Sequence, residues 1–345
     1  MKQSVMKAAR VHEPGKILIE EVPIPEPGPG EVLIKVHRVG LCGTDVGIKN
    51  GYVSAKFPVT LGHEFSGTIA ALGTRCRGGL KEGEPVTAAG GWGCGKCELC
   101  KTGRAVYCRN RASLGRTVDG CMAEFVKVDQ GVVYPLPPSV SFDEGQNMLN
   151  IACVLRAFKK VPLQLGKTVA VFGPGNAGLI MLQVLKMAGA YEAVMVGTRN
   201  FRLEMAKSFG ATHAVNVRRE SAVETITGWY PDGVDIVAEA AGSTSALQDC
   251  FGVLKSGGSM VVFGMFGERM KEFDPSFLYH KEPIIYGSKG GAGSYQEAIQ
   301  VLEEKRLEIV SMITHRFPLD ETAEAFRTFE EKVPDALRIV IEPYS

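Results

Sequence analysis

The chain has 345 residues, of which 45% are hydrophobic and 22% charged, and its formal net charge is +1. A balance this close to neutral, without a run of basic residues, argues against nucleic acid or an anionic membrane as the main partner. No apolar run is long enough for a signal peptide or a membrane-spanning helix, which favours a cytoplasmic protein with reduced thiols; the length favours two domains.

The first 150 residues or so contain many short β-branched stretches separated by Gly and Pro, among them 31–39, 67–72 and 124–128. This pattern predicts a β-rich domain with many turns. Within it, Cys42 lies in the sequence GLCGTDVG and His63 in GHEFSG. A thiolate and an imidazole both suit zinc, although either residue alone is more often part of a core.

Four cysteines follow within fifteen positions, at Cys94, Cys97, Cys100 and Cys108. A cluster this dense indicates a metal site, a redox centre or a disulfide framework. A reducing compartment favours the metal over disulfides. Four thiolates around one zinc ion leave no open position for a substrate, so such a site stabilises a loop and carries out no chemistry.

From about residue 166, strand-like apolar runs alternate with helix-length amphipathic segments. The runs are Thr168–Phe172, Ala193–Val196, His213–Asn216, Val234–Ala238, Ser259–Phe263 and Ile284–Tyr286. Six strands in alternation with helices predict an α/β fold with a doubly wound parallel sheet. Beyond residue 291 we expect helices over 294–306 and 319–331 and a final strand over 337–343.

Gly173, Gly175 and Gly178 follow the first of these strands in the spacing G-x-G-x-x-G. There, glycines let the backbone approach a pyrophosphate at a helix N-terminus. A purely structural glycine turn is the alternative, but the five further strands favour a dinucleotide. The other residues expected to bind it, from the same turn and from later strand ends, are Asn176, Ala177, Gly242, Phe263 and Gly264.

The second strand indicates which dinucleotide binds. An NAD site ends this strand with an acid that accepts from the ribose 2′-hydroxyl. Here the strand ends with Gly197, Thr198 and Arg199, without an acid, and Arg202 and Arg218 follow. A hydroxyl and cations suit a 2′-phosphate, so we expect NADP(H). The alternative is that Arg199 is a solvated surface charge.

Together, the Cys42 and His63 motifs, the four-cysteine segment and the glycine fingerprint resemble the zinc-dependent medium-chain alcohol dehydrogenases. The sorbitol, threonine and secondary-alcohol dehydrogenase branches are the most similar, and the resemblance covers essentially the whole chain. It implies a GroES-like catalytic domain from 1–155 and 291–345, with a structural zinc lobe at 90–110. It also implies a six-stranded Rossmann domain over 156–290.

The resemblance also implies roles for individual residues. The four clustered cysteines would hold a structural zinc ion, and Cys42 and His63 a catalytic one. Thr44 would bond the substrate oxygen and pass its proton outward. Asp45 would orient the zinc ligands, and Glu64 would lie behind the metal or enter its coordination sphere.

Leu149 is a departure from the family pattern. The family's third catalytic-zinc ligand is a Cys or Glu before the helix that leads into the cofactor domain, and Leu149 stands at that position. Glu64 could complete the site and restore its neutral charge. Cys153, Asn147 or Asn150 could replace the ligand instead, or the metal could be weakly held or absent.

Gly47 is a second departure, because family members often carry a histidine there that helps relay the proton. Thr44, the cofactor ribose and water would then suffice, or Lys49 would contribute.

The expected function is hydride transfer between NADP(H) and a secondary alcohol or its ketone, with a polyol, cyclitol or related hydroxylated compound as substrate. The alternatives are a reductase of C=O or C=C bonds without catalytic zinc, and a cofactor-binding protein whose active centre has decayed. Relatives in this family pair through an edge strand, so a homodimer or homotetramer is expected.

Overall fold

The computed structural model describes residues 4–331 and 333–345, which divide into two compact units. The β-rich unit comprises the chain up to Leu149 together with Tyr295–Lys305 and Ile309–Ser345. The parallel-sheet unit comprises Asn150–Ser294 and Arg306–Glu308. The chain first passes from one unit to the other within helix α4 (Met148–Phe158).

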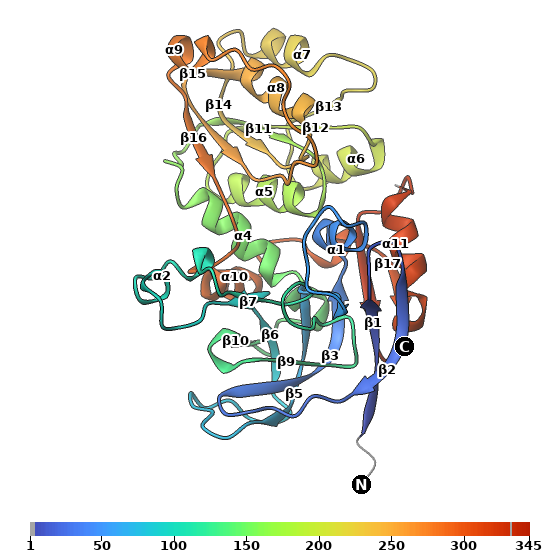
Figure 1. Ribbon diagram of the computed structural model, residues 1–345. Coiled ribbons are helices and arrows are strands. Elements are labelled where there is room, and N and C mark those ends of the chain that lie inside the picture. Colours follow the sequence, from blue (N-terminus) through green and yellow to red (C-terminus); the bar gives the residue numbers. More distant parts are fainter. Residues whose placement is uncertain (1–3, 332) are drawn as a thin grey trace. The chain divides into compact units, whose positions relative to one another are not determined.

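The β-rich unit contains three sheets (Figure 1). Its strands are β1 (Val5–Val11), β2 (Ile17–Pro23), β3 (Glu31–Gly40), β4 (Val59–Thr60), β5 (Phe65–Leu72), β6 (Pro85–Ala88), β7 (Gly91–Trp92), β8 (Ala112–Ser113), β9 (Phe125–Asp129), β10 (Val133–Pro135), β17 (Ile313–Pro318) and β18 (Arg338–Glu342). The largest sheet has the order β10-β6-β5-β3-β18-β17, with β9 paired to β3; the others are β2-β1-β4 and β7-β8. Its helices are α1 (Gly43–Lys49), α2 (Glu98–Lys101), α3 (Phe142–Gly145), α10 (Tyr295–Glu303) and α11 (Thr322–Glu330).

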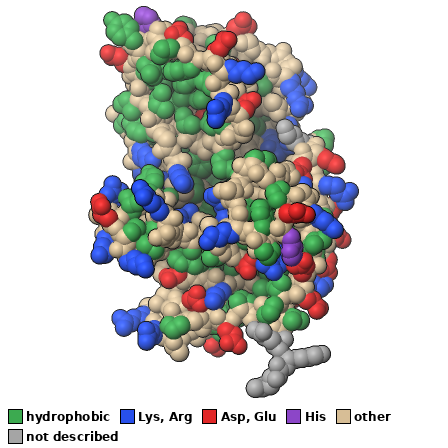
Figure 2. All heavy atoms as spheres, in the orientation of Figure 1, with side chains coloured by type: hydrophobic (Ala, Val, Ile, Leu, Met, Phe, Trp, Pro, Cys, Tyr) green, Lys and Arg blue, Asp and Glu red, His purple; other side chains and the backbone are tan. Residues whose placement is uncertain are grey.

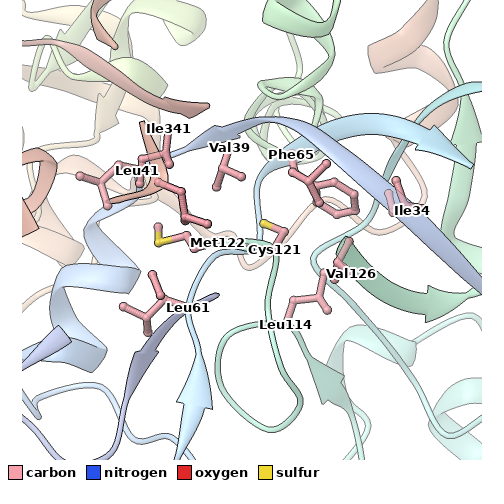
Figure 3. Close-up of a cluster of buried hydrophobic side chains, with 14 of the residues drawn as sticks. Ile34, Val39, Leu41, Leu61, Phe65, Leu114, Cys121, Met122, Val126 and Ile341 are labelled. Atoms are coloured by element: carbon pink, nitrogen blue, oxygen red, sulfur yellow. The ribbon is translucent and has the colours of Figure 1, made fainter. Parts of the chain in front are cut away.

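The core of this unit brings together apolar side chains from strands and loops that are distant in the sequence (Figure 3). Ile34 and Val39 of β3 meet Phe65 of β5, Val126 of β9 and Ile341 of β18, and none of the five is more than 3% exposed. Burying large apolar side chains is the main favourable contribution to folding, at about 25 cal/mol per Å². The long strand β3 is central because it pairs with β5, β9 and β18.

The parallel-sheet unit has six strands, all parallel, in the order β13-β12-β11-β14-β15-β16. They are β11 (Thr168–Phe172), β12 (Glu192–Gly197), β13 (His213–Asn216), β14 (Val234–Glu239), β15 (Leu254–Val262) and β16 (Ile284–Gly287). The helices are α5 (Asn176–Met187), α6 (Asn200–Ser208), α7 (Ala222–Trp229), α8 (Thr244–Val253) and α9 (Ser276–Lys281). The expected doubly wound sheet is confirmed.

This strand order places the site of ligand binding. The chain order reverses between β11 and β14, and open α/β sheets bind ligands beyond the carboxyl ends of the strands at such a point. Among the described residues, every helix is too short or too polar to cross a bilayer.

Candidate functional site

Cys42, His63 and Glu64 form a first candidate metal site in the β-rich unit. Cys42 is the residue before α1, and the other two directly precede β5. The Cys42 sulfur, a ring nitrogen of His63 and a carboxylate oxygen of Glu64 all lie within 4.8 Å of one another. Leu41 and Leu61 are 2% and 0% exposed, so the core holds both segments close to their ligands.

Asp45, in the first turn of α1, is fully buried and organises this cluster. Its Oδ2 accepts a hydrogen bond of 3.1 Å from the Cys42 N–H, and its Oδ1 accepts one of 3.1 Å from the Gly62 N–H. Oδ1 also lies 3.2 Å from Nδ1 of His63. Burial alone would lower the pKa of His63, but Asp45 and Cys42 outweigh it and raise that pKa well above its usual value. A carboxylate on Nδ1 leaves Nε2 for a metal, as in many zinc-binding histidines.

Glu64 is ion-paired to Arg338, the first residue of β18. Nη1 of Arg338 lies 2.6 Å from Oε2 of Glu64, and neither side chain is more than 3% exposed. Arg338 also donates to Oε1 of Gln146 at 3.0 Å and to the carbonyl of Leu41 at 3.3 Å. Sequence reasoning missed Arg338; the one available signal was a charged residue opening an otherwise apolar strand.

The buried charges around this cluster match a divalent cation. A Cys42 thiolate and the carboxylates of Asp45 and Glu64 give three negative charges, against one positive charge on Arg338. Burial, and then the charge of Glu64, raises the pKa of the Cys42 thiol, so a cation is needed to hold the thiolate. Zinc takes thiolate, neutral imidazole and carboxylate ligands. The donor set therefore fits zinc in type and in charge.

Leu149 lies beside this cluster. A Cβ built on Gly90 would be 2.7 Å from Cδ1 of Leu149 and 3.4 Å from Cβ of His63. Leucine has no donor atom, so it cannot serve as a metal ligand at this position. Cys153 belongs to the parallel-sheet unit and, among the described residues, is in neither group of ligand atoms. Glu64 is the third donor that the structure brings to Cys42 and His63.

Three positions could supply a group that relays the substrate's proton to solvent: Thr44, Gly47 and Lys49. Oγ1 of Thr44 lies 3.7 Å from Sγ of Cys42. A Cβ on Gly47 would lie 2.5 Å from a side-chain carbon of Val53, which explains why no larger residue stands there. Nζ of Lys49 is 2.6 Å from a carboxylate oxygen of Glu330. Of these three positions, Thr44 is therefore the one that places a hydroxyl beside the cluster.

Cys94, Cys97, Cys100 and Cys108 form the second candidate metal site, around α2. Their sulfur atoms lie within 4.8 Å of one another, with 3.5 Å from Cys97 to Cys100 and 3.7 Å from Cys97 to Cys108. Tetrahedral zinc with bonds of about 2.3 Å places its sulfurs about 3.8 Å apart, whereas a disulfide measures about 2.0 Å. These four thiols fit zinc and not a pair of disulfides.

The surroundings of Cys94 favour its thiolate, whereas burial raises the pKa of Cys100 to about 12. Backbone N–H groups of Lys96 and Cys97 lower the pKa of Cys94 to about 6. Basic side chains gather over the segment that contains α2 (Figure 2), and the exposed ones are Lys96, Lys101, Arg104 and Arg109. Four thiolates and one zinc ion carry a net negative charge, which these cations offset.

In the parallel-sheet unit, a cavity of ≈ 280 Å³ lies beyond the carboxyl ends of β11, β12 and β14. Six of the residues predicted to bind a dinucleotide line it: Gly173, Gly175, Gly197, Thr198, Arg199 and Arg202. Asn176, Ala177 and Gly178 belong to the first turn of α5, which starts at this cavity. The cavity is thus at the switch point of the sheet, where such folds bind nucleotides.

Each glycine of the G-x-G-x-x-G sequence is required for a different structural reason. Gly173 has φ +100°, and a Cβ there would lie 2.6 Å from the backbone nitrogen of Ala241. A Cβ on Gly178 would overlap the carbonyl oxygen of Gly173, so this glycine lets α5 pack against the turn. Nothing lies within 4 Å of a Cβ on Gly175, which leaves the backbone open for a phosphate to approach.

Arg199 and Arg202 bring two positive charges to this cavity. Burial, and then the charge of Arg218, lowers the pKa of Arg199. Burial, and then the charge of Arg199, lowers the pKa of Arg202 to about 10. Arg218 itself is exposed and does not line the cavity. Burial removes water from these two guanidinium groups, and the two positive charges repel each other. An anionic ligand group in the cavity would offset both costs.

Glu239, the last residue of β14, is a buried carboxylate that sequence reasoning missed. Its Oε1 accepts hydrogen bonds from the N–H groups of Ala241 at 2.9 Å and Gly242 at 2.7 Å. Its backbone carbonyl accepts from Phe263 at 3.0 Å and Gly264 at 3.1 Å. Gly242, Phe263 and Gly264 do not line the cavity. Glu239 joins the two turns that contain them through these hydrogen bonds.

Comparison with known proteins identifies relatives over nearly the whole chain. Residues 28–138 match the family model of the alcohol dehydrogenase GroES-like domain, and residues 177–304 match that of zinc-binding dehydrogenase. The sorbitol dehydrogenase of Bacillus subtilis is 33% identical over 345 residues, covering 98% of this chain and 97% of that protein.

Two solved structures are similar throughout. A Sinorhizobium meliloti protein classed as a zinc-binding dehydrogenase, solved bound to NADP, has a TM-score of 0.93 and 32% identity, covering 99% of this chain and 100% of that one. Galactitol-1-phosphate dehydrogenase from Escherichia coli has a TM-score of 0.90 and 25% identity, covering 98% and 100%.

Proposed function

The chain belongs to the zinc-binding, medium-chain alcohol dehydrogenase family, and from this premise we propose that it transfers hydride between NADP(H) and a secondary alcohol or its ketone. The observation that carries the proposal is the convergence of Cys42, His63 and Glu64 on one point, with Asp45 behind the imidazole. When bound, zinc supplies Lewis acidity toward the substrate oxygen, and the nicotinamide gives or takes the hydride.

The chain's own residues divide the remaining work. Cys42, His63 and Glu64 would hold the metal, and Asp45 fixes the orientation of the imidazole. Thr44, whose hydroxyl lies beside the cluster, would bond the substrate oxygen and exchange its proton with solvent. The hydrocarbon of Leu149 would keep water from one side of the reacting atoms.

Charge at the second strand supports NADP(H) over NAD(H). Thr198, Arg199 and Arg202 line the cavity where an NAD site would present an acid. A similar protein, 32% identical, was solved bound to NADP, which supports the same cofactor for this chain. The sorbitol and galactitol-1-phosphate dehydrogenases among the relatives favour a polyol or a related hydroxylated substrate.

Leu149 favours a second candidate, a reductase of C=O or C=C bonds that works without catalytic zinc, with Thr44 as the proton donor. A binding protein with a decayed centre would hold NADPH and turn over nothing. Zinc analysis and turnover of NADPH with a panel of ketones and activated alkenes separate these two from the leading proposal.

The nucleotide preference is tested by the ratio of kcat/KM for NADPH to that for NADH. The wild type should favour NADPH, and Arg199→Ala should lower kcat/KM for NADPH by about 10- to 100-fold, since one charged hydrogen bond contributes about 1.5–3 kcal/mol. The NADH value should change little. Arg219→Ala, which removes an exposed cation outside the cavity, is the matched control. Equal use of both cofactors by the wild type would exclude the 2′-phosphate site.

We further propose that the protein forms a homodimer, or a tetramer of two such dimers, through β16. This strand is the edge of its sheet, and Ile284 and Ile285 on it are 49% and 41% exposed. An unpaired, apolar edge strand favours pairing with a second copy. Sedimentation should show Ile285→Lys as a monomer; a wild type that sediments as a monomer rules the dimer out.

Since a thiolate cluster requires reduced cysteines, we place the protein in the cytosol.

A further inference from the structure

One acidic side chain lines the nucleotide cavity, and neither the hydride chemistry nor the 2′-phosphate accounts for it. Asp249 lies on α8, with Ser245 and Ala246 of the same helix also on the cavity wall. Among the residues that the structure describes, none forms a hydrogen bond or an ion pair with the side-chain carboxylate of Asp249. Burial raises the pKa of Asp249. A partly buried carboxylate without a protein partner is free to accept a hydrogen bond from a ligand group in the cavity.

The other residues that line the cavity suit the pyrophosphate and the 2′-phosphate, so the adenine base is the part of the nucleotide that remains for the region around Asp249. Gly173 and Gly175 form the turn where a pyrophosphate binds. Thr198, Arg199 and Arg202 form the end that suits the ribose 2′-phosphate. The part of the lining that lies nearest Asp249 in the chain or follows β13 and β14 is small or apolar, namely Val217, Ala240, Ala241 and Ala246, with the hydroxyls of Ser243 and Ser245 beside them. A slot of this kind accepts a flat, apolar ring, which is the purine base.

Asp249 is the side chain in this slot with free hydrogen-bonding capacity for the edge of the base. The hydroxyl of Ser243 accepts from the Ala246 N–H at 3.2 Å as the cap of α8, and it lies 3.3 Å from the hydroxyl of Ser245. Both serine hydroxyls are thus engaged within the first turn of the helix. A carboxylate is an acceptor only, so it pairs with a donor such as an exocyclic amino group.

We propose that Asp249 accepts a hydrogen bond from the 6-amino group of adenine and so selects adenine among purine dinucleotides. This proposal rests on the proposed use of NADP(H) and assigns the base-recognition residue of that same cavity. Adenine offers an N–H donor at this edge, whereas hypoxanthine offers a carbonyl oxygen that would meet the carboxylate unfavourably.

The test compares the dissociation constants of NADPH and of its deamino analogue, nicotinamide hypoxanthine dinucleotide phosphate in reduced form, by titration of the full chain. Wild type should bind NADPH at least about tenfold more tightly than the analogue. Asp249→Asn is close to isosteric and offers an N–H that can donate to the hypoxanthine carbonyl. It should remove this preference, mainly by tighter binding of the analogue. Gln248→Asn, at an exposed neighbour on α8 outside the cavity, should leave the ratio unchanged.

Each failure has its own signature. If the wild type binds NADPH and the deamino analogue equally well, Asp249 does not read the base, and the NADP(H) proposal stands. The same conclusion follows if Asp249→Asn keeps the full preference for adenine. If the wild type binds neither NADPH nor NADH, the proposed cofactor is wrong, and the role of Asp249 is refuted with it.

Discussion

Among single residues, Leu149 is the one from which we expect the clearest effect on how firmly the proposed catalytic metal is held. Its side chain and that of His63 approach the same point above Gly90, and it carries no donor atom. Leu149→Glu would add a carboxylate to the three existing donors. We expect it to raise the affinity of this site for zinc by tenfold or more, measured by competition with a chromophoric chelator.

Leu149→Gln is the matched control, because it has a similar size and a weak neutral donor. It should change zinc affinity much less than Leu149→Glu does. Equal affinity in Leu149→Glu and the wild type would mean that position 149 does not reach the metal, and that the resemblance misplaces it.

Residue patterns close together in the sequence indicated most of both candidate metal sites. Spacing brought out the four cysteines, and motifs brought out Cys42, His63 and Glu64. Arg338 could not be predicted in this way, since it contacts Glu64 only after β18 pairs with β3. In the sequence Glu239 looks like an ordinary strand residue, because its partners are backbone N–H groups of the folded turn that follows β14.

Among the elements, α3 is tied to the large sheet by one carboxylate. Asp143 accepts hydrogen bonds from Nε of Arg38 on β3 at 2.9 Å and from Nη2 of Arg316 on β17 at 2.7 Å. Burial alone would raise the pKa of Asp143, but the two guanidinium groups outweigh it and lower that pKa. The native state therefore binds this proton less readily than the unfolded chain, whose aspartates titrate near a pKa of about 3.9.

The resulting stability is fully present above about pH 4 to 5 and is lost as pH falls through the lower folded-state value. We expect Asp143→Asn to lower the free energy of unfolding by about 1–2 kcal/mol at pH 7. Urea unfolding at several pH values should show the difference between the two proteins shrinking as pH falls below about 4. If the difference in the free energy of unfolding between the two proteins stays constant from pH 7 to pH 3, the substitution destabilises the protein through packing and not through the charge of Asp143.

The two kinds of sheet differ in how well sequence predicts them. Each strand of the parallel sheet is an apolar run between helices, so all six were located, with ends differing by a few residues at most sites and by five at the start of β15. In the β-rich unit, β4, β7 and β8 have two residues each and are defined by their partners alone. Their pairing depends on long-range contacts, which a local pattern cannot reveal.

For the whole molecule, the central claim is that one chain carries two zinc sites, one that stabilises a loop and one that acts on substrate. The most direct measurement is the zinc content of purified, fully loaded protein, wild type and Cys42→Ala. We expect two zinc ions per chain in the wild type and one in the variant, with NADPH binding retained in both. One zinc ion per chain in the wild type, unchanged in Cys42→Ala, would contradict the account.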